Sequence, residues 1–410
     1  MQRSWVLTCL TNFLIAALLG LFLRYMFVNP LDGFNFRFLT HAHSHTAMLG
    51  WVYLMLYSLI VWRFIPKPRK IYKRLFWVTE FAVIGMVLSF PFEGYAAVSI
   101  TFSTLHIFCS YYFARLVWKD EAENELPEKK LLKASLLFML LSTLGVWCLG
   151  PAVAMAGAGS PFYNIAIQFF LHFQFNGWFL LAVLAIFFKT LNKSGLKIDQ
   201  KEFKKFYFLI IAATILSLAL PVGWYAPHPM LLILNGAGVV LQLVALYFFL
   251  KIIRPQWSVF SNQISPITRI MFSFALLNFI LKVVLQSSSI FPEIAAVSHQ
   301  LRNLVIGFIH LMMLGVISGF LFAFLFQSSL VKPNSRLLSW GAGIFLTGFI
   351  ATEAILFGQG GMYYFSLGIL PQYNLILFLF SCLLVIGILI ILLSILRHPK
   401  PLPKRSREDQ

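Results

Sequence analysis

Long apolar runs separated by short polar stretches make up almost the whole chain. Twelve of these runs are close to the ~20 residues that a helix needs to cross the hydrocarbon core of a bilayer. They cover residues 5–27, 42–65, 75–97, 99–118, 134–157, 163–188, 206–223, 230–252, 267–287, 303–327, 338–357 and 373–396. The pattern predicts an all-α, polytopic membrane helical bundle of about 12 transmembrane helices. We expect a single transmembrane domain over residues 1–397.

Charged residues lie mainly in alternate connections between the apolar runs. If the N-terminus is inside, the inner segments hold Arg3, the basic stretches within 67–74, 119–133 and 189–205, and the later basic connections. The outer side holds only Arg37 and, at the edge of a run, Arg302. By the positive-inside rule, both termini are predicted to be cytoplasmic, in a membrane of the bacterial inner (plasma) type. Residues 398–410 form a basic cytoplasmic tail that we expect near anionic lipid.

Composition supports a membrane protein and excludes two other classes. The chain is 60% hydrophobic and only 11% charged, which is too apolar for a soluble globular protein of 410 residues. The net charge of +18 does not indicate nucleic acid as a partner, because the basic residues are dispersed between the spans. The four cysteines form no C-x-x-C pair and no C-x-x-C-H motif, so neither a disulfide framework nor covalently attached heme is indicated.

Three of the nine histidines fall within five residues, at the start of the second apolar run. The stretch L-T-H-A-H-S-H-T-A-M-L-G-W contains His41, His43 and His45. If it is helical, His41 and His45 share one face and His43 points elsewhere. The cluster is typical either of a heme or metal ligand set or of an interfacial group without a metal.

Histidines also recur at one depth in four spans. His45, His106, His172 and His310 all lie in the outer half of the second, fourth, sixth and tenth runs. Ionisable groups inside a membrane are costly and mark candidate functional sites. The layer of His45, His106, His172 and His310 therefore predicts a heme or metal site.

Two arginines support a heme in particular. Arg37 precedes His45 by eight residues, and Arg302 precedes His310 by eight. Imidazoles on two helices can hold heme iron from both sides, and cations at the rim can bind the propionates. The matched offset of Arg37 and Arg302 fits a porphyrin whose propionates face outward; the alternative is that the arginines are interfacial. Residues 46–56 and 310–321 also echo each other, although no strong internal repeat is evident.

The run H-A-H-S-H-T-A-M-L-G-W and the twelve spans resemble subunit I of the heme-copper oxidase superfamily. They are also similar to NnrS-type membrane proteins. The resemblance implies that His45 (or His41 or His43) and His310 hold a low-spin heme and that His172 belongs to a second metal centre. The family's His-His pair on the seventh helix is missing, and the tenth run has one histidine instead of two. A complete binuclear oxygen-reducing centre is therefore not expected.

Three functions follow from these features. The first is a membrane b-type heme protein in electron transfer or in handling O2 or NO, with His45 and His310 as the axial ligands. His172, His106 and the remaining His41 or His43 would form a second site for copper or another metal. Such a protein would be an oxidoreductase if it turns over, and its partners would be lipid and an electron-donor protein or quinone. Since the ligand must be neutral imidazole, heme binding should weaken below about pH 6. The second is a copper-handling or other metal-handling transport protein that uses the histidine layer. The third is an accessory subunit whose heme site has decayed.

Overall fold

A computed structural model of the chain describes residues 1–121, 126–332 and 335–397, and helices make up almost all of this part. The basic tail over 398–410 lies outside the described residues. Twelve helical stretches are long and apolar enough to cross a membrane, which confirms an integral membrane protein. No strand occurs within the described ranges.

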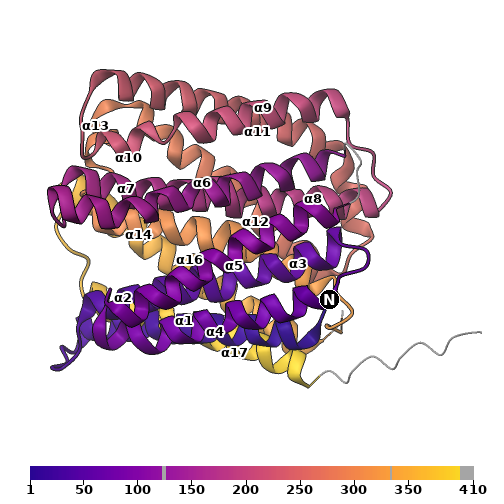
Figure 1. The fold of residues 1–410 in the computed structure, drawn as a ribbon, viewed down its shortest axis with the longest axis horizontal. Helices are drawn as coiled ribbons and strands as arrows, with labels where there is room; N and C mark the ends of the chain where they lie inside the picture. Colours follow the sequence, from indigo (N-terminus) through magenta and orange to yellow (C-terminus); the bar gives the residue numbers. More distant parts are fainter. Residues whose placement is uncertain (122–125, 333–334, 398–410) are drawn as a thin grey trace, which may run out of the picture.

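The twelve spans follow one another with short connections (Figure 1). Three of them consist of an α-helix, a π-helix and a second α-helix, and the short helix α13 (Pro292–Val297) precedes the tenth span. The spans are α1 (Arg3–Val28), α2–η1–α3 (Phe36–His45, Thr46–Tyr53, Leu54–Phe64), α4 (Lys70–Glu93), α5 (Ala97–Asp120), α6 (Pro127–Ala156), α7–η2–α8 (Pro161–His172, Phe173–Phe179, Leu180–Lys193), α9–α10 (Gln200–Leu216, Ala219–Gly223), α11 (Pro229–Asn262), α12–η3 (Pro266–Ser287, Ser288–Ile290), α14–η4–α15 (Arg302–His310, Leu311–Ser318, Gly319–Phe326), α16 (Arg336–Tyr364) and α17 (Tyr373–Leu396).

The second span begins earlier than its hydropathy predicts. Its helix starts at Phe36 because the Asn35 side chain accepts hydrogen bonds from the backbone N–H groups of Arg37 and Phe38. Polar side chains inside the helix are satisfied locally; the Ser44 hydroxyl, for example, donates to the Thr40 carbonyl at 2.8 Å. All three clustered histidines therefore belong to the transmembrane helix, not to the loop before it.

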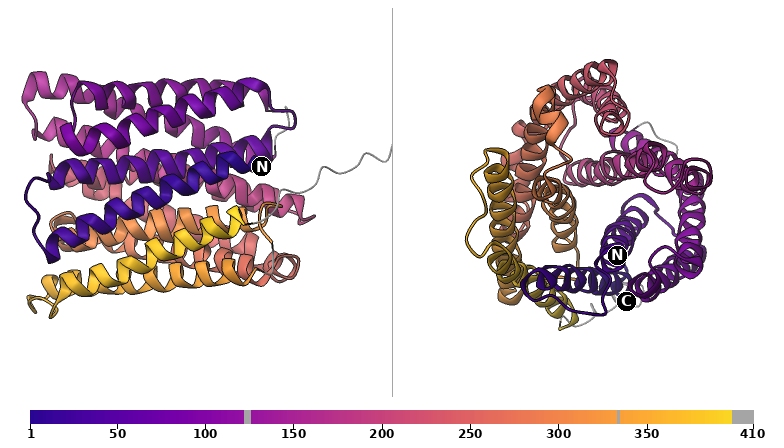
Figure 2. Two further views of the ribbon diagram at one scale, coloured as in Figure 1. Left: turned by 90° about the horizontal axis from the view of Figure 1, so that it is seen from below. Right: turned by 90° about the vertical axis from the view of Figure 1, so that its left-hand side faces the viewer.

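The second, sixth and tenth spans form the interior of the bundle. In their most apolar stretches 78%, 72% and 61% of the residues are buried, compared with 33–50% in the other nine. The view along the helices shows the first, middle and last thirds of the chain in three separate sectors (Figure 2, right). Each sector has four consecutive spans, whose third and fourth members pack along each other as α4 with α5, α9 with α11 and α16 with α17. The fold is thus a pseudo-threefold arrangement with one inner span in each sector.

Both ends of the described chain lie at the same end of the bundle. The Arg3 guanidinium donates to the carbonyls of Ile395 and Leu396, at 3.0 and 2.8 Å, and α1 packs along α17. This contact closes the ring of sectors. The predicted cytoplasmic location of that end stays a prediction.

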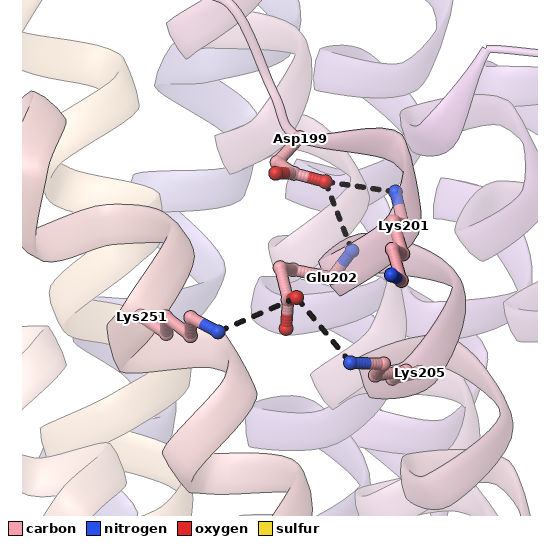
Figure 3. Close-up of polar contacts among 5 residues, drawn as sticks. All are labelled: Asp199, Lys201, Glu202, Lys205 and Lys251. Carbon is pink, nitrogen blue, oxygen red and sulfur yellow. Dashed lines mark hydrogen bonds and ion pairs between the residues drawn. The ribbon is translucent and has the colours of Figure 1, made fainter.

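Lysines at this end of the bundle are paired with the few acidic residues there (Figure 3). The Glu202 carboxylate lies 3.3 Å from Lys205 and 3.4 Å from Lys251. Asp199 caps α9, and the backbone N–H groups of Glu202 and Lys201 lower the pKa of its carboxyl below the ordinary value. These pairs join the α9–α11 hairpin at its basic end.

Candidate functional site

Each inner span changes from α-helix to π-helix directly after a histidine. The residues are His45 before η1, His172 before η2 and His310 before η4. Wide π turns are rare and occur often at functional sites. These three histidines at equivalent positions are therefore candidate functional residues.

A glycine five residues after each histidine lets the first span of the same sector approach closely. An added Cβ would lie 3.0 Å from Asn12 at Gly50, 2.6 Å from Phe138 at Gly177, and 2.8 Å from Asn278 at Gly315. The three inner spans thus share the pattern H-x4-G. The similarity between residues 46–56 and 310–321 is part of this threefold repeat. Residues 172–178 form its third copy, which the sequence comparison of the second and tenth runs did not include.

His43 and His310 lie within electrostatic reach of each other where the first and third sectors meet. His43 points toward α1, and its Nδ1 is 2.8 Å from the Ala16 carbonyl. An N–H at Nδ1 donates this bond and leaves the Nε2 lone pair available to a metal. His310 is close enough to His43 and Arg24 for their charges to interact, and a quarter of its side chain is exposed although it lies within a span.

Charged and hydroxyl groups surround this pair. His310 Nδ1 lies 3.8 Å from the Glu353 carboxylate, whose oxygens have no hydrogen-bond partner among the described residues. Arg24 lies beside the Tyr373 hydroxyl and within electrostatic reach of Glu353. Sequence reasoning does not single out Arg24, although an arginine within an apolar run is a signal of its own. We call His43, His310, Glu353, Arg24 and Tyr373 the His43–His310 crevice.

The two arginines predicted as a matched pair lie on different sides of α2. Arg302 stacks over the rings of Phe27 and Phe36 and is within electrostatic reach of Arg24, so it belongs to the His43–His310 crevice. Arg37 instead interacts with His41 and Tyr95. Arg37 and Arg302 therefore do not face the same space.

His45 and His41 face the first sector and not His310. His45 Nδ1 is 2.9 Å from the His41 carbonyl, and its Nε2 is 3.1 Å from the Tyr95 hydroxyl. The ring of His41 packs against Tyr95, with the ring centroids 4.6 Å apart. Since both nitrogens of His45 are engaged, the structure favours His43 over the predicted His45 as the partner of His310.

The three histidines predicted for a second metal have separate neighbours. His43 contacts Ala16, His106 lies against the ring of Tyr53 at 4.6 Å, and His172 Nε2 is 2.7 Å from the Thr214 carbonyl. His106 Nε2 is buried without a hydrogen-bond partner in the described part of the chain. Within that part, no three His, Cys, Asp or Glu side chains gather as metal ligands. The structure thus supplies no ligand set for the predicted copper site.

Gly20 determines where the ring of His43 lies. A Cβ at position 20 would be 2.8 Å from His43 Cε1 and 3.0 Å from Nδ1, so Gly20→Ala must displace the imidazole from the Ala16 carbonyl. We expect this variant to fold but to lose any spectroscopic signal that depends on His43. Gly343→Ala is the matched control, because no described atom lies within 4 Å of its added Cβ. Equal visible spectra for the two purified variants would contradict a role for the His43 orientation.

No protein-family model matches this chain, and neither does any curated protein.

Proposed function

We propose that this chain is an integral membrane heme protein in which His43 and His310 bind the iron from two sides. The observation that carries the proposal is that these two imidazoles, on the inner spans of the first and third sectors, lie within electrostatic reach of each other. The Nδ1 of His43 bonds to the Ala16 carbonyl, which leaves its Nε2 lone pair to bind iron. Two histidines facing across a gap between helices are a common way to bind heme iron. When bound, the heme supplies one-electron redox chemistry.

The surroundings of the pair suit a b-type heme. Arg24 and Arg302 are cations on the same side of the second span, and they can bind propionates by charge-assisted hydrogen bonds. Glu353 beside His310 Nδ1 can accept the ring N–H and thereby present Nε2 to the iron. These contacts replace the predicted set of His45, His41 and Arg37 with one that converges on a single crevice.

A role in electron transfer or in handling a diatomic gas, O2 or NO, follows from the proposed heme. Such a role agrees with the resemblance to heme-copper oxidase subunit I, which enters here as part of the proposal. The missing histidines of the seventh and tenth spans argue against a complete oxidase centre. The electron donor would be a protein or a quinone, and the membrane would be of the bacterial inner type with both termini in the cytoplasm. The alternative of metal transport has no ligand cluster to support it within the described residues.

The test is a reduced-minus-oxidised visible spectrum of the purified full-length protein, with metal analysis of the same sample. We expect a sharp b-type α band and about one iron per chain. Stoichiometric copper or zinc without iron would favour the metal-handling alternative. Protein that contains neither heme nor metal, even after expression with added heme precursor, would contradict both functions.

Arg302 offers a finer test of how the heme is held. We expect Arg302→Ala to keep the α band, because both ligands remain, and to shift the midpoint potential or reduce heme occupancy, because a cation near the propionates is lost. A redox titration with heme quantification measures both. Arg37→Ala removes the same charge on the opposite side of α2 and should leave both values unchanged. If Arg37→Ala causes the larger shift, the propionates lie on the His41 side and the proposed crevice is wrong.

A further inference from the structure

The boundary between the second and third sectors contains a cation that no protein group balances. Lys282 of α12 is 0% exposed, and its Nζ has no hydrogen-bond partner among the described residues. No acidic side chain in those residues forms a salt bridge with it. Burying an unpaired charge is strongly unfavourable, so a partner must be supplied from elsewhere if the lysine is charged.

Two glutamine side chains lie near Lys282 in the packing of α11 against α12. The Asn235 side chain of α11 donates to the carbonyl and hydroxyl of Ser289, which sets the register of α11 against the antiparallel α12. Two turns from this contact, the same register places Gln242 opposite Lys282. Gln286 lies one turn further along the Lys282 face of α12.

These glutamines are also unsatisfied. The Oε1 atoms of Gln242 and Gln286 are buried without hydrogen bonds in the described part of the chain. His172 of the inner span lies within electrostatic reach of Lys282, and its ring is fixed by the Thr214 carbonyl. Buried polar groups in proteins are almost always hydrogen-bonded. The unpaired atoms of Lys282, Gln242 and Gln286 therefore indicate a missing partner.

We propose that Lys282, Gln242 and Gln286, where α7, α9, α11 and α12 meet, bind a small inorganic monoanion of halide or nitrite size. Lys282 provides the charge, and a half turn of each amide group brings the NH2 groups of Gln242 and Gln286 toward the anion in place of their oxygens. This site is independent of the heme proposal, because it shares no residue with the His43–His310 crevice.

Bromide is the probe for this site, because its anomalous scattering identifies it in a crystal. We expect crystals of the full chain grown in sodium bromide to show an anomalous peak within hydrogen-bond distance of Lys282 Nζ. The peak should be lost in Lys282→Met and kept in Lys251→Met, which removes an equal charge from an exposed lysine at the basic end. A water molecule or empty density beside Lys282 in the wild-type crystals would overturn the proposal.

Thermal unfolding of the wild type keeps the proposal testable if Lys282→Met does not fold. At equal ionic strength, bromide should raise the unfolding temperature in a saturable way relative to gluconate, which is too large to enter, because a ligand that binds only the folded state stabilises it. Lys282→Arg should keep this response and Gln242→Leu should weaken it. Identical unfolding temperatures in the two salts would contradict anion binding.

Discussion

Replacing His310 with alanine is expected to abolish the low-spin heme spectrum while leaving the protein in the membrane. The reason is that His310 would provide one of two axial ligands, and the histidine within electrostatic reach of it is the proposed partner His43. Visible spectra and pyridine hemochrome assays of the purified variant measure the loss. Added imidazole should restore part of the α band, since it can occupy the space that the side chain leaves.

The partner of His310 is identified by comparing two neighbours on the same helix. We expect His43→Ala to lose the low-spin spectrum as well, and His45→Ala to retain it, because both ring nitrogens of His45 already contact the His41 carbonyl and the Tyr95 hydroxyl. The two variants remove the same side chain two positions apart, so each controls for the other. Loss in His45→Ala with retention in His43→Ala would restore the pair predicted from sequence.

The number and places of the spans could be predicted from the sequence because a bilayer imposes one length on every helix. Two features could not. The start of the second span depends on a cap at Asn35 and on hydroxyls that bond within the helix, and both lower the apparent hydropathy of a true helix. The distinction between inner and outer spans is also hidden, because lipid and protein interior are both apolar and either neighbour selects the same side chains.

For the candidate site, the place of each histidine along its span could be predicted but its direction could not. The apolar runs place His45 and His310 within the second and tenth spans, yet the side of the helix that faces the third sector depends on how the helices pack. That packing turns His43 toward α1 and His45 toward Tyr95. The same rotation separates Arg37 from Arg302, even though both stand eight residues before a histidine.

Replacing Gly177 with leucine is expected to cause the largest loss of stability among single substitutions of the inner spans. Gly177 follows His172 in the threefold pattern, and an added Cβ would lie 2.6 Å from both Cβ and Cγ of Phe138 on α6. Phe138 is itself buried, so it has little room to move. Inserting extra carbons into a packed interior typically costs about 1–3 kcal/mol. We expect a lower yield of monodisperse protein and a lower unfolding temperature in detergent, with Gly177→Ala intermediate.

The control for this prediction is a glycine that faces no neighbour. Gly343→Leu adds the same side chain to an exposed position of α16, where no described atom lies within 4 Å of the new Cβ, and it should unfold at the wild-type temperature. Because Gly50 and Gly315 occupy equivalent positions, leucine at either should resemble Gly177→Leu and not Gly343→Leu. If all three variants were as stable as Gly343→Leu, the close approach of the first span in each sector would not be what holds the inner spans in place. The fixed positions of His45, His172 and His310 would then need another explanation.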